Sequence, residues 1–311
     1  MPELPDVELY VHALTRLLAG ERLERLRVAS PFLVRSVGVP PKEAEGKTVL
    51  SFRRLGKRIV WELEGGPFLV VHPMIAGRFH WKPRGEGFPP AAVPKRGGLA
   101  GFDFAKGTLL LTEQGTKRRA SLHILRTEGE VAALHRGGLE PLGSSLANFR
   151  RALLSESHTL KRALTDPRLF SGIGNAYSDE ILHAARLSPT QRTGNLSDDE
   201  VVALHRAVTG TLETWAKRLL DEAGAAFPEK VTAFRPGMAV HGRYGQPCPR
   251  CGAPVQRIVH AENEANYCAP CQTGGKLLAD RALSRLLHED WPRSLEEMEE
   301  AKATRRGDPT S

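Results

Sequence analysis

The start of the chain carries two groups that could do covalent chemistry. It reads Met1-Pro2-Glu3-Leu4-Pro5, and a methionine before proline is normally removed after synthesis, which would leave Pro2 with a free secondary amine. A terminal amine has a pKa of about 8, so a usable fraction is neutral and nucleophilic at physiological pH. Its attack on a carbonyl or glycosidic carbon gives an iminium cation directly, and the Glu3 carboxylate could act as acid or base. The alternative interpretation is that the prolines only stiffen the start of a helix.

All four cysteines lie in one short segment, with the spacing Cys248-x2-Cys251-x16-Cys268-x2-Cys271. Two such pairs on separate knuckles can place four thiolates tetrahedrally around one zinc ion. Two disulfides are the competing interpretation, but cysteines so close in sequence bridge poorly and a cytoplasmic chain is kept reduced. The spacing therefore predicts one zinc ion per chain, with a structural role and no open coordination position.

Composition is that of an ordinary globular protein, with 41% hydrophobic and 26% charged residues in a chain of 311. This length predicts two or three domains. No apolar run approaches the roughly 20 residues that a membrane helix needs, and the start has no signal-peptide pattern, so we expect a soluble cytoplasmic protein. The net charge of +8 and the pI near 9.5 permit a polyanionic partner without identifying one.

The elements that would position these groups begin with a helix. Apolar residues after the start have helical spacing, at Val7, Val11, Leu14 and Leu18. This spacing predicts a helix of about three turns, opened by Pro5 and Asp6, that would fix Pro2 at its start.

Between Leu23 and Leu125 the pattern changes to short β-rich runs separated by turn signals. The predicted strands are Thr48–Phe52, Arg58–Leu63, Phe68–His72, Arg78–Trp81, Leu99–Phe104, Thr108–Thr112 and Ser121–Leu125. They indicate a β-sandwich or barrel with a surface loop at Lys82–Gly98.

Helical signals follow a linker at Gly137–Ser145, which is rich in glycine, proline and serine. Short helices are predicted at Leu146–Leu154 and Leu160–Leu164. Ser197 and Glu200 have the spacing of a capping box, which would start a long amphipathic helix.

Gly172 and Gly174 stand two residues apart in the stretch 171–177, just before a helical pattern. Glycines there let the backbone approach a ligand and point free N–H groups at it, which suits phosphate. A tight helix connection is an equal alternative for this stretch alone.

The segment Met238–Gln272 around the cysteines is basic, with Arg243, Arg250 and Arg257. Beyond it, a helix is predicted at Leu277–Leu287, and the charged end at Glu296–Ser311 is expected to be frayed.

Four motifs, taken in order, resemble those of the formamidopyrimidine-DNA glycosylase and endonuclease VIII family of base-excision repair enzymes. They are Pro2-Glu3-Leu4-Pro5, Arg54-Leu55-Gly56-Lys57, Gly172-Ile173-Gly174-Asn175-Ala176-Tyr177 with Glu180, and Gly242-Arg243-Tyr244-Gly245-Gln246-Pro247-Cys248. The resemblance spans roughly residues 2 to 272, and four motifs in order are more specific than any one alone.

The resemblance implies an α+β multi-domain fold. Residues 1–136 would form an N-terminal β-sandwich catalytic domain with a leading helix, 146–237 a helix-two-turns-helix DNA-binding domain, 238–275 a zinc finger and 276–311 a C-terminal extension. It implies damaged double- or single-stranded DNA as the partner, bound in a basic cleft between domains. It also implies a monomer with no membrane partner, located in the cytoplasm with the bacterial nucleoid.

The resemblance also implies roles for single residues. Pro2 would attack the anomeric carbon of a flipped damaged nucleotide, and Glu3 would assist protonation and ring opening. Lys57 would belong to the catalytic set and would also bind DNA, holding phosphates around the lesion together with Asn175. Further DNA contacts would come from Arg118, Asn175, Tyr177, Arg243 and Asn263.

Several positions depart from the family pattern. Asp6 stands where the family usually has glutamate, and Asn263 where the finger hairpin usually carries an arginine, whose bidentate contact an amide cannot replace. At the wedge that fills the gap left by a flipped base, the family's methionine, arginine and phenylalanine correspond to Ile75, Arg118 and Ala120. The loop before the finger, at residues 227–230, lacks the usual lesion-capping pattern.

The sequence therefore favours a DNA glycosylase with lyase activity that works through a Schiff base on Pro2. A non-catalytic protein that binds damaged DNA is the alternative that Asn263 supports, although such a protein has no use for Pro2 and Glu3. A zinc-ribbon RNA-binding protein would explain the charge and the cysteines but neither Pro2 nor the glycine turn.

Overall fold

The computed structural model describes residues 1–85, 87–115, 117–232, 235–260, 263–278, 292 and 294–298. Most of the helix predicted at Leu277–Leu287, and most of the end at Glu296–Ser311, lie outside these residues. Within these ranges no helix combines the length and the apolar character needed to span a membrane. The chain divides into two compact units, Met1–Glu140 with Leu212–Ala233, and Pro141–Thr211 with Phe234–Ser311. We call them the N-terminal and C-terminal units.

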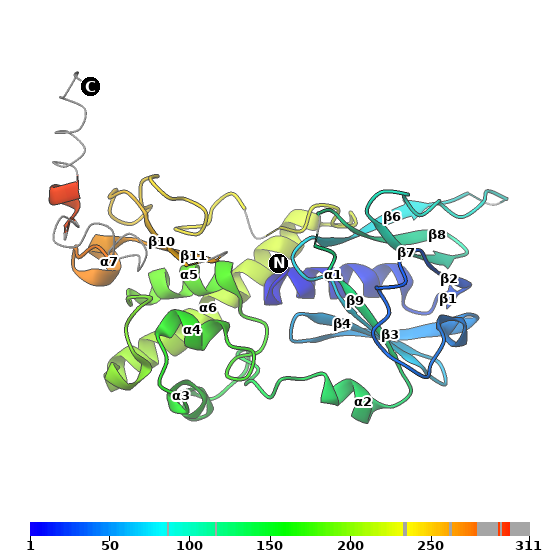
Figure 1. Cartoon of the computed structure of the whole chain (residues 1–311), viewed down its shortest axis with the longest axis horizontal. Helices are drawn as coiled ribbons and strands as arrows, with labels where there is room; N and C mark the ends of the chain where they lie inside the picture. The colour runs from blue at the N-terminus through cyan, green and yellow to red at the C-terminus, as the bar shows by residue number, and fades with distance from the viewer. Residues whose placement is uncertain are drawn as a thin grey trace, which may run out of the picture. The chain divides into compact units, whose positions relative to one another are not determined.

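The N-terminal unit consists of two antiparallel sheets and a leading helix, α1 (Leu4–Leu18) (Figure 1). One sheet has the strand order β1-β3-β4-β5-β9 and the other β2-β7-β8-β6. The strands are β1 (Arg22–Leu23), β2 (Arg25–Val28), β3 (Lys47–Leu55), β4 (Arg58–Leu63), β5 (Phe68–His72), β6 (Gly77–Pro83), β7 (Gly98–Phe104), β8 (Gly107–Glu113) and β9 (Ser121–Leu125). A short 3-10 helix, η1 (Pro41–Ala44), precedes β3, and α2 (Glu128–Ala133) follows β9.

Aromatic side chains join the two sheets into one core. Trp61 of β4 is fully buried and packs against Phe52 of β3 and Phe102 of β7, with ring centroids 5.0 and 4.7 Å apart. These contacts confirm the predicted β-sandwich with a leading helix. On α1, Tyr10 packs edge-on against Phe79 of β6 at 5.3 Å.

Long-range contacts fix α1 within the N-terminal unit. Arg16 near the end of α1 donates from its guanidinium to the carbonyl oxygens of Gly224 and Ala225, both at 2.6 Å. The helix has 15 residues, about four turns at 3.6 residues per turn, so the predicted three turns were too few. It begins one residue before Pro5, since proline is tolerated in the first turn.

The C-terminal unit contains helices and one hairpin. Its elements are α3 (Leu146–Leu154), α4 (Leu160–Thr165), α5 (Asn175–Ala185), η2 (Thr193–Asn195), β10 (Gln256–His260), β11 (Asn263–Tyr267) and α7 (Ala269–Thr273). The long helix α6 (Asp198–Ala223) starts in this unit and ends in the N-terminal unit. Its predicted capping box is present, because the Glu200 N–H donates to Ser197 Oγ at 3.2 Å and the Ser197 N–H to the Glu200 carboxylate at 2.8 Å.

The predicted glycine turn opens α5. Gly172 adopts φ +82°, which only glycine accommodates easily, and Gly174 is the residue that precedes the first turn of the helix. Asn175 is therefore the first helical residue of α5.

Candidate active site and zinc centre

The terminal amine lies among charged side chains of the N-terminal unit. Met1 is present here, so the amine is that of Met1; its removal would pass the amine to Pro2, which is buried beside Glu3. Burial lowers the pKa of this amine, Glu3 and Asp6 raise it, and Arg78 and Lys57 lower it further. The fold thus surrounds the start of the chain with two carboxylates and two cations.

Asp6 fixes Glu3 at the start of α1. The Glu3 backbone N–H donates to the Asp6 carboxylate at 2.9 Å, and Asp6 is fully buried. Glu3 itself is only 2% exposed. Asp6, although shorter than the glutamate that the family usually has there, therefore still reaches the Glu3 backbone N–H, and the Glu3 side chain in turn accepts the Asp6 backbone N–H in a capping box.

Lys57 occupies the tight turn between β3 and β4, where Gly56 has φ +61°. Arg54 holds this turn, because its Nε donates to the Glu8 carboxylate of α1 at 2.6 Å and its Nη1 to the Gly56 carbonyl at 3.1 Å. Its Nη2 pairs with the Glu140 carboxylate. Burial lowers the pKa of Lys57, while the nearby Glu3 carboxylate raises it. Pro2, Glu3 and Lys57, far apart in sequence, are thus brought together.

His72 and Arg78 belong to the same surroundings, and sequence reasoning did not single them out. Burial, together with the nearby Arg58, Lys57 and His123, lowers the pKa of His72 to about 3. The ring is therefore neutral; its Nδ1 lies 3.0 Å from the Met74 N–H and accepts from it. The proton then resides on Nε2, which remains available as a donor.

The turn between β5 and β6 presents Ile75. Met74 has φ +57°, the left-handed region that non-glycine residues rarely adopt, and a Cβ on Gly77 would lie 2.1 Å from the Pro73 carbonyl oxygen. Arg78 Nη1 closes the turn by donating to the carbonyls of Ile75 and Gly77 at 3.0 and 2.7 Å. The Ile75 side chain is 57% exposed.

The other two wedge candidates differ from each other. Arg118 is exposed, whereas Ala120 is 3% exposed. The Glu113 carboxylate accepts the backbone N–H groups of Arg119 and Ala120 at 2.9 and 3.0 Å. Ala120 therefore lies in packed surroundings with little space for a larger side chain.

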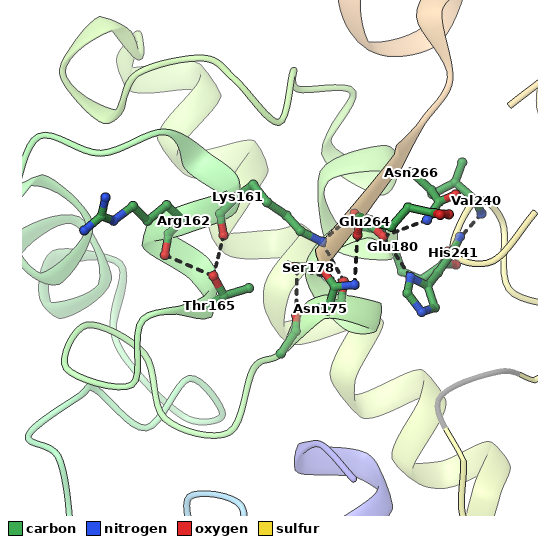
Figure 2. Close-up of polar contacts among 12 residues, drawn as sticks. Lys161, Arg162, Thr165, Asn175, Ser178, Glu180, Val240, His241, Glu264 and Asn266 are labelled. Carbon is green, nitrogen blue, oxygen red and sulfur yellow. Dashed lines mark hydrogen bonds and ion pairs between the residues drawn. The ribbon is translucent and has the colours of Figure 1, made fainter. Parts of the chain in front are cut away.

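In the C-terminal unit, Asn175 joins α5 to the finger hairpin. Its Nδ2 donates to the Glu264 carbonyl of β11 at 2.8 Å, and Lys161 Nζ donates to the Asn175 carbonyl at 2.6 Å (Figure 2). Lys161 also pairs with Asp179 at 2.5 Å. Tyr177 is fully buried, so its side chain packs within the unit.

Two buried acids of α5 hold the segment that leads into the finger. The Glu180 carboxylate accepts the N–H groups of Ala239, Val240 and His241 at 2.7 to 2.9 Å. Asp179 contacts His241 Nδ1 at 2.8 Å and Asn266 Nδ2 at 3.4 Å. Glu180, one of the residues that carry the family resemblance, thus helps to attach the finger to α5.

Arg243 uses all three guanidinium nitrogens inside the finger. It donates to Gln246 Oε1 at 3.1 Å, to the Met238 carbonyl at 2.9 Å and to the Pro247 carbonyl at 3.2 Å. Asn263 is the first residue of β11 and pairs with His260.

The four cysteines converge as their spacing predicts. Their sulfur atoms all lie within 4.8 Å of one another, and none forms a disulfide. Burial would raise the pKa of Cys248, yet the backbone N–H groups of Arg250 and Cys251 leave it below its ordinary value. Four thiols from two knuckles, with N–H groups that stabilise a thiolate, fit a tetrahedral zinc ion.

His183 of α5 touches this centre, and no sequence signal indicated it. Its Nε2 lies 3.3 Å from Cys248 Sγ, and it is buried. A zinc-bound thiolate can only accept, so His183 Nε2–H would be the donor. Arg250 Nη1 donates to the His183 carbonyl at 2.8 Å, and Gln272 joins the Cys268 N–H to the Leu187 carbonyl, both at 2.9 Å.

Comparison with known proteins matches the whole of this arrangement. Residues 1–173 match the formamidopyrimidine-DNA glycosylase N-terminal domain, residues 138–218 the formamidopyrimidine-DNA glycosylase H2TH domain and residues 245–274 the zinc finger found in FPG and IleRS. The formamidopyrimidine-DNA glycosylase of Thermus thermophilus is 34% identical over 283 residues, which cover 88% of this chain and 100% of that protein. An uncharacterized formamidopyrimidine-DNA glycosylase-like protein of Mycobacterium tuberculosis is 40% identical over 150 residues, 48% of this chain and 93% of that protein.

Solved structures agree on the fold. The crystal structure of the MutM (Fpg) protein from Thermus thermophilus superposes with a TM-score of 0.71 at 32% identity, covering 87% of this chain and 98% of that one. The Lactococcus lactis Fpg in complex with DNA that contains an abasic site has a TM-score of 0.74 at 23% identity, covering 87% and 99% of the two chains. The second likeness supports the fold alone.

Proposed function

This chain belongs to the formamidopyrimidine-DNA glycosylase family, and from that premise we propose that it excises damaged bases from DNA and cleaves the resulting abasic site. The observation that carries the proposal is the placement of the terminal amine. Burial lowers its pKa, and Glu3, Asp6, Lys57 and Arg78 surround it. A lowered pKa increases the neutral, nucleophilic fraction of an amine, and a buried acid beside it can assist proton transfer, so this placement favours attack on a glycosidic carbon.

The chemistry follows from these groups. The Pro2 nitrogen attacks C1′ of the damaged nucleotide, the C1′–base bond breaks, and the base leaves with its bonding electrons and a proton. The proton on the departing base is the one that the Pro2 nitrogen loses. Glu3, after taking up a proton from solvent, gives it to the sugar-ring oxygen as the C1′–O4′ bond opens, which leaves an iminium cation on Pro2. Loss of a C2′ proton then expels the 3′ phosphate by β-elimination. Flipping the nucleotide out of the stack makes C1′ reachable.

Phosphate contacts would hold the flipped nucleotide. Lys57 supplies a cation beside the amine, and His72 supplies a neutral Nε2–H donor. In the C-terminal unit, the positive end of the α5 helix dipole lies at the Gly172–Gly174 turn, and this end suits an anion. The zinc ion would be structural, because all four ligands come from the chain.

Borohydride trapping on DNA that contains an abasic site tests the proposal. Borohydride reduces the iminium to a stable covalent adduct, and digestion followed by mass spectrometry should place that adduct on Pro2. A chain with a peptide added before Pro2 should bind the same DNA but give no adduct. Undiminished trapping from a verified blocked terminus would refute Pro2 and would point to a lysine such as Lys57.

A non-catalytic binder of damaged DNA is the second candidate. Its specific support is Asn263 in place of the family's hairpin arginine. A non-catalytic binder whose terminus is verified as Pro2 should bind an abasic analogue tightly and should give no trapped adduct at any pH.

A further inference from the structure

Basic side chains gather on one face of the five-stranded sheet. Strand pairing places Ile59 opposite Val71 and Val70 opposite His123. Because side chains alternate along strands, Arg58 and His123 share the face of Val70, opposite to the face of Trp61 that packs on the second sheet. Arg35 joins them beside β9, since its N–H donates to the Leu122 carbonyl at 2.9 Å after the Val34–Leu122 bridge.

Helix α2 packs on this face through one apolar contact cluster. Val131 of α2 packs on Val60 and Val70, with Leu134 at the margin of the cluster. Arg136 follows two residues later and is exposed, as is Arg35, while Arg58 and His123 are half-buried. We call Arg35, Arg58, His123 and Arg136 the basic shelf.

Within the described part of the chain, no carboxylate pairs with the shelf. Candidate acids are engaged elsewhere: Glu62 accepts from Ser51 Oγ at 2.8 Å and Glu128 pairs with Arg53 at 2.6 Å. The Arg58 Nε is buried and has no hydrogen-bond partner among these residues. A buried donor without a partner is costly, and an incoming acceptor would relieve that cost.

The shelf groups also destabilise one another. Burial and then Arg136 lower the pKa of Arg58, and burial followed by Arg58 and Arg35 lowers the pKa of His123. Like charges held together without a counter-ion create a positive potential that attracts an anion. Guanidinium groups match the paired oxygens of a phosphate better than any other side chain does.

We propose that the basic shelf binds backbone phosphates of the DNA strand beyond the lesion. The inference rests on the proposed function, which places a phosphate at Lys57. His72 follows Val70 by two residues on β5 and so shares the face of the shelf, and Arg58, Lys57 and His123 all act on its ring. A strand held at Lys57 therefore has its neighbouring phosphates within reach of the shelf. An acidic protein segment is the competing occupant, and it does not account for this continuity with Lys57.

The test is the salt dependence of DNA binding. Affinity for a duplex with a tetrahydrofuran abasic analogue, extending well beyond the lesion on both sides, is measured at several NaCl concentrations. The slope of log affinity against log salt should become shallower by about 1.8 in Arg58→Gln with Arg136→Gln, since each lost phosphate contact removes about 0.9. Arg58→Lys keeps the positive charge, so it should retain most of the share of the slope that Arg58 provides.

The matched control is Arg53→Gln with Arg126→Gln. These arginines lie in the same unit and give the same charge change, but they pair with Glu128 and Glu43, so the slope should stay that of the unsubstituted protein. An unchanged slope in the shelf variant, or equal changes in both double variants, would overturn the proposal. Borohydride trapping by the unsubstituted protein reports on the proposed function separately, because the slopes are measured on an analogue that cannot form an adduct.

Discussion

The side-chain amide of Asn175 donates to the backbone carbonyl of Glu264 at 2.8 Å, so the first residue of α5 is bonded to strand β11 of the finger. An asparagine at a helix start next to a glycine turn is also well placed to meet phosphate. Any phosphate contact by this amide must use its second N–H or replace the bond to Glu264.

Asn175→Ala should lower affinity for an abasic-site duplex about 5-fold, since a net hydrogen bond contributes about 1 kcal/mol. Zinc content should not change. Fluorescence anisotropy measures the affinity, with Asn148→Ala on α3 as the control, because Asn148 contacts only the exposed Arg151 through its side chain. Equal affinities for the two variants would argue that Asn175 serves neither the hairpin nor DNA.

Schiff-base formation should depend on pH with a midpoint below that of an exposed terminal amine. Burial lowers the pKa of the terminal amine, so its neutral form persists to lower pH, and the trapping rate rises as pH increases through that pKa. Lys57→Ala removes a cation that lowers this pKa and should move the midpoint upward. Glu3→Gln removes a carboxylate that raises it and should move the midpoint downward.

The measurement is the single-turnover trapping rate on DNA with a preformed abasic site, across the pH range in which the protein stays folded. A midpoint that does not move in either variant would mean that the reacting amine lies elsewhere.

His183→Phe should speed zinc loss to a chelator. The substitution removes the N–H group that faces Cys248 Sγ at 3.3 Å, and loss of such outer contacts typically costs 10-fold or more in metal affinity, to about 100-fold. Cobalt substitution should show a shifted thiolate-to-metal absorption band. His205→Gln is the control, since His205 bonds to the Ser144 carbonyl, away from the cysteines. Identical release rates in both variants would leave His183 with a packing role alone.

Substituting Ile75 and Ala120 with the residues that the family usually has at these wedge positions should have different effects. Ile75→Met places a longer side chain on an exposed turn, so it should strengthen the dependence of excision on the opposite base without loss of stability. Ala120→Phe forces a large ring into a packed site beside Glu113 and should cost about 1–3 kcal/mol of folding stability.

Single-turnover excision of one accepted lesion opposite each of the four bases, together with thermal unfolding, separates these effects. The unsubstituted protein should depend weakly on the opposite base. A strong preference that Ile75→Met does not alter would show that Ile75 is not part of the wedge.

Local patterns predicted much of the fold because they act over a few residues. The bounds of β4, β5, β9 and α3 agree with the sequence pattern, since alternation and helical periodicity are local signals. Strands β1 and β2 were missed, because two and four residues carry almost no period and these strands exist only through pairing with β3 and β7.

The sequence pointed to candidate site residues where a motif contains them, and not where only the fold brings them near one another. Pro2, Glu3, Lys57 and the four cysteines came from motifs. Arg78 acts on the terminal amine and His72 lies near Lys57 only because the β5–β6 turn places them there, and no short sequence pattern reveals the shape of that turn. The burial of Ala120 likewise depends on Glu113, a contact that the sequence alone cannot indicate.

The contact of Arg16 with Gly224 and Ala225 has a consequence for how the protein is made. Residue 2 leaves the ribosome long before residue 225, so this tie to α1 cannot form until residue 225 has emerged. At about 5–20 residues per second, the terminus waits on the order of ten seconds or more before this tie can form. Enzymes that remove Met1 therefore have access to a terminus that has not yet been fixed, and a chain that escapes them in this interval would fold around a blocked amine.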